Sequence, residues 1–335
     1  MNKYLPAWKL IAESLQQQIP VMLLYVLESS GSSPGRQGFF MVVNAKNELD
    51  SYQMEGSIGG GIMEHKFVEM AKQQLRVMSS DPIAIGSAIA ELRKQTHDKS
   101  AAKNQSGMIC SGEQTILLYP VQKKDEEQIL KIISSLEENK NGTLKLSPKG
   151  IEFSESIPEE NFRFSMRSGQ DWEYSEKTGY KHELSIIGGG HCALAFSKLM
   201  SGMDFYTRVY DERKNLKTML ENESAHEKHF VNDYSELTSI IPPGNSHYVV
   251  IMTFGYRTDD MALRALIDKE FKYLGLLGSK SKIAKMFEDY RQEGFEEKLL
   301  QRIHAPIGIP VKSQTPEEIA VSIAAEIIKI KNQPL

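Results

Sequence analysis

The first 120 positions alternate between two spacings of apolar residues, and each spacing indicates a different kind of element. Residues 5–18 carry apolar side chains at helical intervals, whereas Val21–Leu27 is a continuous apolar run typical of a buried strand. A helix is expected at 62–78, where apolar residues again fall on one face. Three more extended segments are predicted at 39–43, 49–54 and 115–120, and the polar stretch 80–106 is predicted to be irregular. Residues 1–125 are therefore predicted to form an N-terminal mixed α/β domain.

The pattern changes after residue 125. A charged helical stretch is followed by segments that alternate polar and apolar residues around Pro-Lys-Gly and Ser-Gly turns. This pattern predicts a helix and small β-hairpins over residues 126–182, which would link two domains.

From residue 183 to residue 335, strand-like and helix-like segments alternate regularly. Alternating βα units of this length predict an α/β fold, a Rossmann-like, doubly wound parallel sheet with right-handed crossovers. The last helix has a marked start, with Thr315 as the expected N-cap, Pro316 as the first helical residue and Glu318 completing a capping box.

The glycine run at Gly188, Gly189 and Gly190 follows one of these strands and opens a helix. With Ala193 it fits the G-x-G-x-x-[GA] pattern of dinucleotide-binding folds, and Asp211 ends the next strand 23 residues after Gly188. Gly188 permits a tight turn, Gly190 lets the backbone approach a pyrophosphate, and Ala193 lets the helix pack close to the strand. This pattern predicts one nucleotide-binding loop.

The predicted helix N-terminus offers free N–H groups to phosphates, and the Asp211 carboxylate can accept hydrogen bonds from ribose hydroxyls. That carboxylate disfavours a 2′-phosphate, although Arg213 nearby leaves this possibility open. The alternative is a Rossmann-type fold that binds no nucleotide at this loop.

An earlier glycine run does not fit the dinucleotide pattern. Its glycines are spaced G-x-x-G-G-G, and no strand ending in an acid follows at the required distance. The run nevertheless opens a helix, so its backbone N–H groups can bind an anion or a polar ring edge. The alternative is a tight turn that requires positive φ angles. Its candidate residues are Gly56, Gly59, Gly60, Gly61 and, in the first helical turn, Glu64.

Charge and composition restrict the possible partners. The net charge is −4 and no run of five Lys or Arg residues occurs, which argues against nucleic-acid binding. The apolar run Val21–Leu27 is far shorter than the roughly 20 residues of a membrane span. No signal-peptide pattern opens the chain, so we expect a cytoplasmic protein. Its partner is expected to be a small molecule or another protein.

The chain has two cysteines, Cys110 and Cys192. This number excludes a disulfide framework and is too small for one iron–sulfur cluster held by four cysteines. No metal site is predicted.

Several motifs together identify a family resemblance. In order along the chain they are SSPGRQG (32–38), GSIGGGIME (56–64), the Cys-x-Gly of CSGEQTILLYPV (from 110), IIGGGHCALA (186–195), YDER (210–213), YLGLLGSKSK (273–282) and HAPIGIPVKSQTPEEIAVSIAAEI (304–327). With these motifs the chain resembles the xanthine dehydrogenase accessory (XdhC/CoxI) family over most of its length.

The resemblance implies a function that is not dehydrogenation. Such proteins bind molybdenum cofactor, as molybdopterin or its dinucleotide form, and protect it while a cysteine desulfurase helps to install a terminal sulfido ligand. They then transfer the cofactor to apo xanthine dehydrogenase. A homodimer is the expected oligomer, because two-fold dimers are the commonest assemblies.

The cysteine count agrees with this implication. Xanthine dehydrogenase requires two iron–sulfur clusters, each held by four cysteines, and this chain has two cysteines in total. The chain therefore cannot be that enzyme, but it can serve it.

Cys110 is the residue best suited to handle sulfur, because the Ser-Gly that follows it can lower a thiol pKa and keep it reachable. The alternative is a small buried apolar residue at a strand edge. Some family members carry a second Cys at the position of Ile62, so a two-thiol mechanism is not supported here. Cys192 is expected to pack against the sheet.

A further departure concerns the strand end before residue 260. Thr253 and Asp259 match the family pattern and are candidate cofactor-binding residues, whereas Phe254 and Tyr256 replace histidines. A histidine-based metal or proton-transfer role is therefore not supported at this strand end. The two aromatic rings can stack on a pterin, or they can simply pack at the rim.

Three charged residues complete the candidate set. Lys280 and Lys282 follow a predicted strand end, where open α/β sheets bind ligands, and they either neutralise a phosphate or remain solvated. Glu64 either accepts a hydrogen bond from a pterin amino group or only complements its helix dipole.

The leading hypothesis is therefore a molybdenum-cofactor chaperone that supports cofactor sulfuration and insertion into xanthine dehydrogenase. The alternative is an NAD(P)-dependent oxidoreductase, favoured by the glycine pattern and Asp211. A third hypothesis is a ligand-sensing protein without catalytic chemistry.

Overall fold

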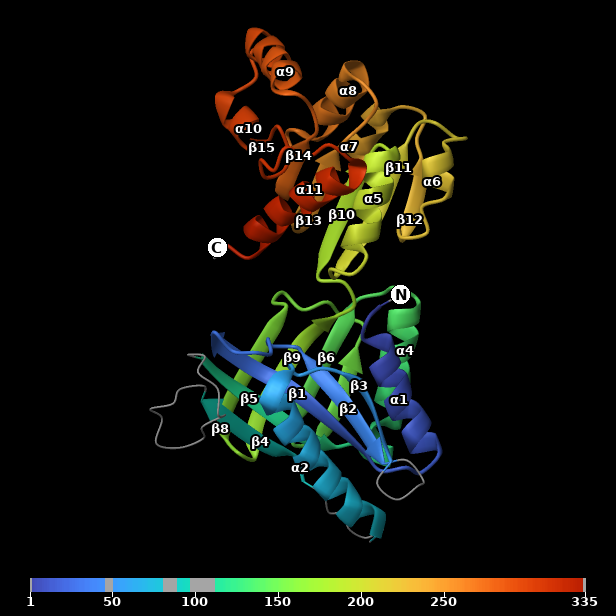
Figure 1. Ribbon diagram of the computed structural model, residues 1–335, viewed down its shortest axis with the longest axis vertical. Helices are drawn as coiled ribbons and strands as arrows, with labels where there is room; N and C mark the ends of the chain where they lie inside the picture. Colours follow the sequence, from blue (N-terminus) through green and yellow to red (C-terminus); the bar gives the residue numbers. More distant parts are fainter. Residues whose placement is uncertain (1, 46–50, 81–88, 97–111, 334–335) are drawn as a thin grey trace. The chain divides into compact units, whose positions relative to one another are not determined.

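The computed structural model describes residues 2–45, 51–80, 89–96 and 112–333. The chain divides into two compact units, Met1–Gly179 and Tyr180–Leu335 (Figure 1). Within the described ranges, no helix combines the length and the apolar character needed to cross a membrane.

The first unit contains a five-stranded antiparallel sheet in the order β3-β2-β1-β5-β4. Its strands are β1 (Val21–Gly31), β2 (Phe40–Ala45), β3 (Tyr52–Gly56), β4 (Glu91–Thr96) and β5 (Gly112–Pro120). Successive residues of β1 face opposite sides. Leu23 and Tyr25 pack with helix α1, and Met22 and Leu24 pack with helix α2. The continuous apolar run of this central strand therefore reflects burial on both faces.

Among the described residues of this unit, three helices pack on the sheet. Helix α2 (Gly61–Ser80) contributes to the apolar cluster on one face, and helices α1 (Leu5–Gln16) and α4 (Glu126–Glu137) contribute to the cluster on the other (Figure 1). Helix α1 begins with a proline in its first turn and buries a stripe that includes Trp8 and Ile11. A short 3-10 turn, η1 (Lys123–Asp125), precedes α4.

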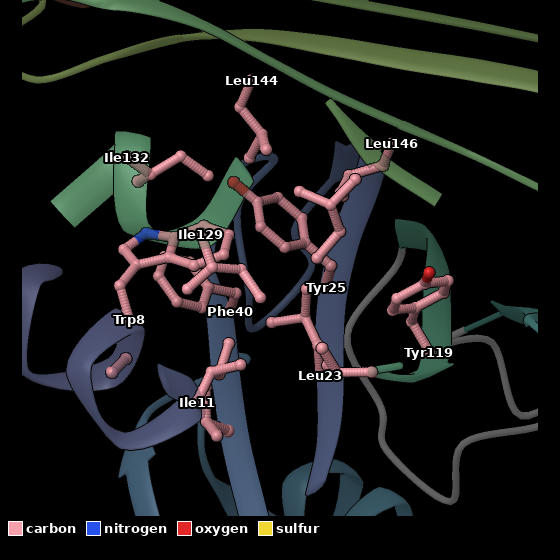
Figure 2. Packing of buried hydrophobic residues seen from close by; sticks show 14 of the residues in the cluster. Trp8, Ile11, Leu23, Tyr25, Phe40, Tyr119, Ile129, Ile132, Leu144 and Leu146 are labelled. Carbon is pink, nitrogen blue, oxygen red and sulfur yellow. The ribbon is translucent and has the colours of Figure 1, made fainter. Parts of the chain in front are cut away.

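A second antiparallel sheet, in the order β7-β6-β9-β8, completes the first unit. Its strands are β6 (Gly142–Ser147), β7 (Gly150–Ser154), β8 (Phe162–Ser168) and β9 (Asp171–Thr178). Leu144 and Leu146 of β6 join Trp8, Tyr25 and Phe40 in one core (Figure 2). The segment 126–178 is thus part of the first unit's core, whereas the hairpin pattern suggested a bridge between two domains.

A buried carboxylate ties the two sheets together. The hydroxyls of Tyr25 and Tyr174 both donate to Oε2 of Glu176, at 2.6 and 2.7 Å. Burial and the Glu176 charge raise the pKa of both tyrosines well above its ordinary value. The two hydroxyls therefore stay protonated donors, and they satisfy a carboxylate that would otherwise be costly to bury.

The second unit is a six-stranded parallel sheet in the order β12-β11-β10-β13-β14-β15. Its strands are β10 (His182–Ile187), β11 (Phe205–Asp211), β12 (Glu227–Phe230), β13 (Gly244–Ile251), β14 (Phe271–Leu276) and β15 (Ile303–His304). Because β10 lies in the middle and the chain order runs outward on both sides of it, the sheet is doubly wound. The predicted α/β fold, with a Rossmann-like parallel sheet and a mixed N-terminal domain, is confirmed.

Helices lie on both faces of this sheet (Figure 1). They are α5 (His191–Met200), α6 (Lys217–Leu220), the 3-10 turn η2 (Tyr234–Glu236), α7 (Leu237–Ile240), α8 (Tyr256–Leu266), α9 (Lys280–Gln292), α10 (Glu297–Gln301) and α11 (Pro316–Lys331). Helices α5 and α11 share one apolar cluster, and α8 and α9 share the other. At α11 the Thr315 hydroxyl accepts from Glu318 N at 3.2 Å, as predicted for the N-cap. The predicted capping box is not completed, because the Glu318 carboxylate accepts from Gln314 N at 2.6 Å instead of from Thr315 N.

One strand lies where the sequence predicted irregular structure. Strand β4 falls within the polar stretch 80–106 and, in the part of the chain that the structure describes, pairs with β5 alone at the edge of the sheet. Most of its side chains are exposed or half-buried. An edge strand of this kind needs no apolar alternation, so the hydrophobic pattern does not reveal it.

Glu326 on α11 connects this helix to strands β14 and β15 and to the loop that follows β15. Its Oε2 accepts from the Tyr273 hydroxyl and, at 2.8 Å, from Gly308 N, while His304 Nδ1 lies 3.7 Å from Oε1. Burial raises the pKa of Glu326, but His304, Tyr273 and Gly308 outweigh it and lower the pKa to about 2. The carboxylate is therefore charged and bound in the folded state.

We expect Glu326→Gln to lower the free energy of unfolding of the second unit by about 2 kcal/mol at pH 7. The folded pKa lies below the ordinary value, so this contribution is complete above about pH 4.5 and disappears as the pH falls towards 2. Urea unfolding at pH 7, 5 and 3 measures it, with the exposed Glu317→Gln as control. A difference between wild type and Glu326→Gln that does not shrink between pH 5 and 3 would contradict this assignment.

Candidate functional site

The loop between β10 and α5 has the geometry that its glycine pattern requires. Gly188 has φ +105°, and a Cβ there would lie 2.5 Å from the carbonyl oxygen of Met252. Gly190 has φ −71°, and a Cβ there would meet no atom within 4 Å. Ala193 is fully buried against the sheet. Gly188 is thus needed for the fold, whereas Gly190 leaves open space beside the backbone.

Asp211, at the end of β11, contacts this loop directly. Its Oδ2 accepts from Gly189 N at 2.7 Å, and its Oδ1 accepts from Arg213 N at 2.8 Å. The side chain is fully buried and also forms an ion pair with the Arg213 guanidinium. Burial raises the pKa of Asp211, but the hydrogen bonds from Arg213 and Gly189 outweigh it and hold the pKa below its ordinary value. The sequence suggested a ribose acceptor, but the structure uses both oxygens within the protein.

Arg213 and Phe254 stack beside the glycine loop. The guanidinium carbon lies 4.7 Å from the Phe254 ring centroid. Arg213 follows β11 and Phe254 follows β13, and these strands flank β10 on its two sides. Phe254 is 60% exposed as a residue, and the Arg213 side chain is 35% exposed. The pair is therefore accessible to a ligand at the carboxyl edge of the sheet, where open α/β sheets bind ligands.

Half-buried Thr253 and buried Asp259 form a second polar group at the same edge. Asp259 Oδ1 accepts from Thr253 N at 3.0 Å and from Thr253 Oγ1 at 2.6 Å. Its Oδ2 forms an ion pair with the Lys282 ammonium, which also donates to the Leu277 carbonyl at 3.3 Å. A Cβ on Gly188 would lie 2.9 Å from the Thr253 Cα, so this network supports the strand end against which the glycine loop packs.

Of the two candidate lysines, only Lys282 joins the site. Lys280 is the first residue of α9 and is exposed, and its side chain has no hydrogen bond or ion pair with any residue in the described ranges. Ser279 caps this helix by accepting from Lys282 N at 3.2 Å. A lysine three residues after an N-cap lies beside the cap, and that spacing is the sequence signal that separates Lys282 from Lys280.

In the first glycine run, backbone amides are hydrogen-bonded to a carboxylate of the helix that follows. Gly59, Gly60 and Gly61 all have positive φ. Glu64 Oε2 accepts from Ile58 N at 3.0 Å, from Gly60 N at 3.1 Å and from Ser57 Oγ at 2.6 Å. Gly56 also has positive φ, and its Cβ would lie 2.3 Å from the Phe40 carbonyl oxygen. The loop's amides therefore bind the protein's own carboxylate in this structure.

The remaining sulfur and aromatic candidates are placed as follows. Cys110 lies outside the described residues. Cys192 is half-buried in the α5–α11 cluster, and burial, followed by the Glu317 charge, raises its pKa. Ile62, where some family members have a cysteine, is exposed.

Tyr256 donates to Asp289 Oδ2 at 2.8 Å, which fixes its ring against α9. In the described ranges, no cluster of three or more His, Cys, Asp or Glu side chains is arranged to hold a metal ion.

Two family models match the chain in order along its sequence. The model of the XdhC and CoxI family matches residues 14–80, and that of the XdhC Rossmann domain matches residues 184–327. The matches together cover more than half of the chain, one in each compact unit. The chain belongs to the XdhC and CoxI family.

Relatives of this XdhC-family chain match it in part. It is 32% identical to the uncharacterized protein YqeB of Escherichia coli (strain K12) over 157 residues, which are 46% of this chain and 28% of YqeB. It is 29% identical to a probable xanthine dehydrogenase subunit from Bacillus subtilis (strain 168) over 84 residues, 25% of this chain and 23% of that protein. The matches therefore span about a quarter of the length of each relative.

One solved structure shares the XdhC fold over nearly the whole chain. It is a protein from Bacillus halodurans described as a xanthine dehydrogenase, with a TM-score of 0.67 and 21% identity. The likeness covers 97% of this chain and 96% of that chain. At this identity it shows a common fold.

Proposed function

We propose that this protein is an accessory protein of xanthine dehydrogenase that binds molybdenum cofactor, supports its sulfuration and delivers it to the apo-enzyme. The observation that carries the proposal is a loop with open backbone at Gly190, bonded through Gly189 N to the carboxylate that also holds the partly exposed guanidinium of Arg213. Backbone N–H groups and a planar guanidinium are suited to a phosphate, and every form of the cofactor bears one. Membership of the XdhC and CoxI family supports the choice of cofactor.

The residues at this edge fit the phosphate end of the cofactor. Gly190 leaves room for close approach, Arg213 supplies a positive charge, and Phe254 presents an exposed ring on which a planar group can stack. Thr253 and Asp259 contribute by fixing the adjacent strand end, because their polar atoms bond to each other and to Lys282. When bound, the cofactor supplies the metal and its dithiolene ligand, while the protein binds, orients and shields it.

The first unit has a different part in this proposal. Glu64 already occupies the amides of Ile58 and Gly60, so this glycine loop is assigned a fixed shape and no phosphate. Cys110 remains the proposed sulfur-handling residue, on the strength of its sequence context and the family resemblance. The cysteine desulfurase, the apo xanthine dehydrogenase, a homodimeric state and a cytoplasmic location belong to the same proposal.

We expect protein co-expressed with a molybdopterin pathway to retain a pterin, detected as its fluorescent oxidised form after denaturation. Cys110→Ala should retain this pterin but lose sulfido transfer to the apo-enzyme by at least about tenfold, because the thiolate is the nucleophile in such transfers. Cys192→Ala is the matched control, since its pKa is raised and it lies half-buried in the α5–α11 cluster. Pterin-free protein from a competent host would contradict the proposal.

An NAD(P)-dependent oxidoreductase is the second candidate, favoured by the G-x-G-x-x-A loop at 188–193. The buried and fully bonded Asp211 argues against recognition of an NAD ribose diol. Titration with NADH and NADPH, followed by a turnover assay with small carbonyl compounds and pterins, tests this candidate. Tight nicotinamide binding with turnover would favour it over the accessory role.

A further inference from the structure

Arg213 is held in one orientation by its own neighbour. Its Nε donates to Asp211 Oδ1 at 2.9 Å, and its Nη2 donates to Asp211 Oδ2 at 2.7 Å. Both donors are thus engaged by a carboxylate that is fully buried and anchored to Gly189 N. Two parallel hydrogen bonds of this kind fix the plane of the guanidinium as well as its position.

The rest of the guanidinium faces outward. Among the described residues, Nη1 of Arg213 has no hydrogen-bond partner, although a third of the side chain is exposed. One face of the group is covered by the Phe254 ring at 4.7 Å. A guanidinium restrained on one edge and one face presents donors in a fixed direction, so less side-chain entropy is lost when it binds a ligand.

The chemistry of the ligand follows from what each group can still accept or donate. A ribose diol would donate to a carboxylate, but both oxygens of Asp211 are already bonded and the side chain is buried. A phosphate monoester carries two negative charges and accepts several hydrogen bonds, which suits the free edge of Arg213. In Rossmann folds an arginine near this strand end accommodates a 2′-phosphate.

We infer that Arg213, oriented by Asp211 and stacked on Phe254, recognises a phosphate monoester on the ligand of this site. This inference rests on the proposed function and extends it by naming the chemical group of the ligand that the protein recognises. The monoester has two possible sources, the terminal phosphate of a pterin cofactor or the 2′-phosphate of a nucleotide. In either case Arg213 sets the preference for the phosphorylated form over its dephosphorylated counterpart.

The test measures this preference with two probe pairs on the full-length protein. One pair is NADP⁺ and NAD⁺, and the other is oxidised molybdopterin before and after phosphatase treatment, each titrated by calorimetry or fluorescence. The wild-type protein should prefer the phosphorylated member of at least one pair by about tenfold or more. Arg213→Gln should reduce that preference to less than about threefold. Lys214→Gln removes a neighbouring exposed charge and should leave the preference unchanged.

A conservative variant protects the test against loss of folding. Arg213→Lys keeps a cation beside Asp211 but lacks the planar fork, so it should fold and still lose most of the preference. Phe254→Leu leaves the ion pair between Asp211 and Arg213 intact. It should therefore weaken the binding of the phosphorylated and the unphosphorylated probe equally.

The inference is overturned if wild type discriminates in neither pair, or if Arg213→Lys and Arg213→Gln both discriminate as wild type does. A failure of the proposed function can be distinguished from a failure of this inference by the pterin content of the protein. Protein that never carries a pterin but loses its NADP⁺ preference in Arg213→Gln would retain this inference and exclude the cofactor role. Protein that carries a pterin but binds it equally with and without phosphate, and that also binds NADP⁺ and NAD⁺ equally, would exclude this inference and retain the cofactor role.

Discussion

Gly190→Ala is expected to reduce cofactor binding by about 10- to 100-fold while the second unit keeps its stability. The backbone at Gly190 has an ordinary φ of −71°, and an added Cβ meets no protein atom within 4 Å. The methyl group therefore costs the fold nothing. It projects into the space that a phosphate needs in order to approach the loop, so the penalty falls on the complex alone. Pterin content per mole of protein and urea unfolding are the two measurements.

Two other glycines provide the controls for this prediction. Gly188→Ala should destabilise the unit by about 2 kcal/mol or more, because φ is +105° and the Cβ would lie 2.5 Å from a carbonyl oxygen. Gly202→Ala should change neither the pterin content nor the stability to urea. Its Cβ is also in open space, and it lies just beyond the far end of α5. Wild-type pterin content in Gly190→Ala would mean that the ligand does not approach this loop.

The second unit could be predicted because its determinants are local. Each strand is a short apolar run, each helix follows within a few residues, and strands buried under helices on both faces need no alternation. The glycine pattern also encodes backbone requirements directly, as the positive φ of Gly188 and the burial of Ala193 illustrate. Sequence spacing alone was therefore sufficient for this fold and for the position of its loop.

The first unit was harder to predict, because its core forms between distant segments. Strands β6 and β9 pack on residues more than 100 positions earlier, such as Tyr25, and the contact through Glu176 has no sequence signature. Alternating polar and apolar residues indicate a hairpin but not the surface that it will cover. The edge strand β4 is missed for a related reason, since little of it is buried.

At the candidate site, the sequence could name residues but could not give their bonding. Asp211 was predicted to bind a ribose and instead binds Gly189 N and Arg213, because the turn after β11 brings the arginine back onto the acid two residues before it. Side-chain pairing of this kind depends on the exact backbone path of the loop, which the sequence pattern does not specify. Lys282 differs from Lys280 by half a helical turn, and only the former reaches Asp259. The role of Cys110 stays a prediction.

Asp211→Asn is expected to lower the free energy of unfolding of the second unit by about 3 kcal/mol or more at pH 7. The amide keeps the shape of the side chain but removes the charge opposite Arg213. It also turns one acceptor into a donor, which then faces either Gly189 N–H and Arg213 Nη2 or the backbone N–H and Nε of Arg213. Glu212→Gln, a change of the next residue, removes a charge that has no ion pair within the described ranges and should cost less than about 0.5 kcal/mol.

The pH dependence separates a lost ion pair from a general packing defect. The pKa of Asp211 is lowered in the folded state, so its stabilisation is complete above the ordinary aspartate pKa of about 4 and is lost as the pH falls through the folded value. The difference in free energy of unfolding between wild type and Asp211→Asn should therefore be constant from pH 7 to 5 and should decrease below pH 4. A gap that persists unchanged at pH 3 would assign the loss to packing, and the carboxylate that orients Arg213 would then have no electrostatic role in the fold.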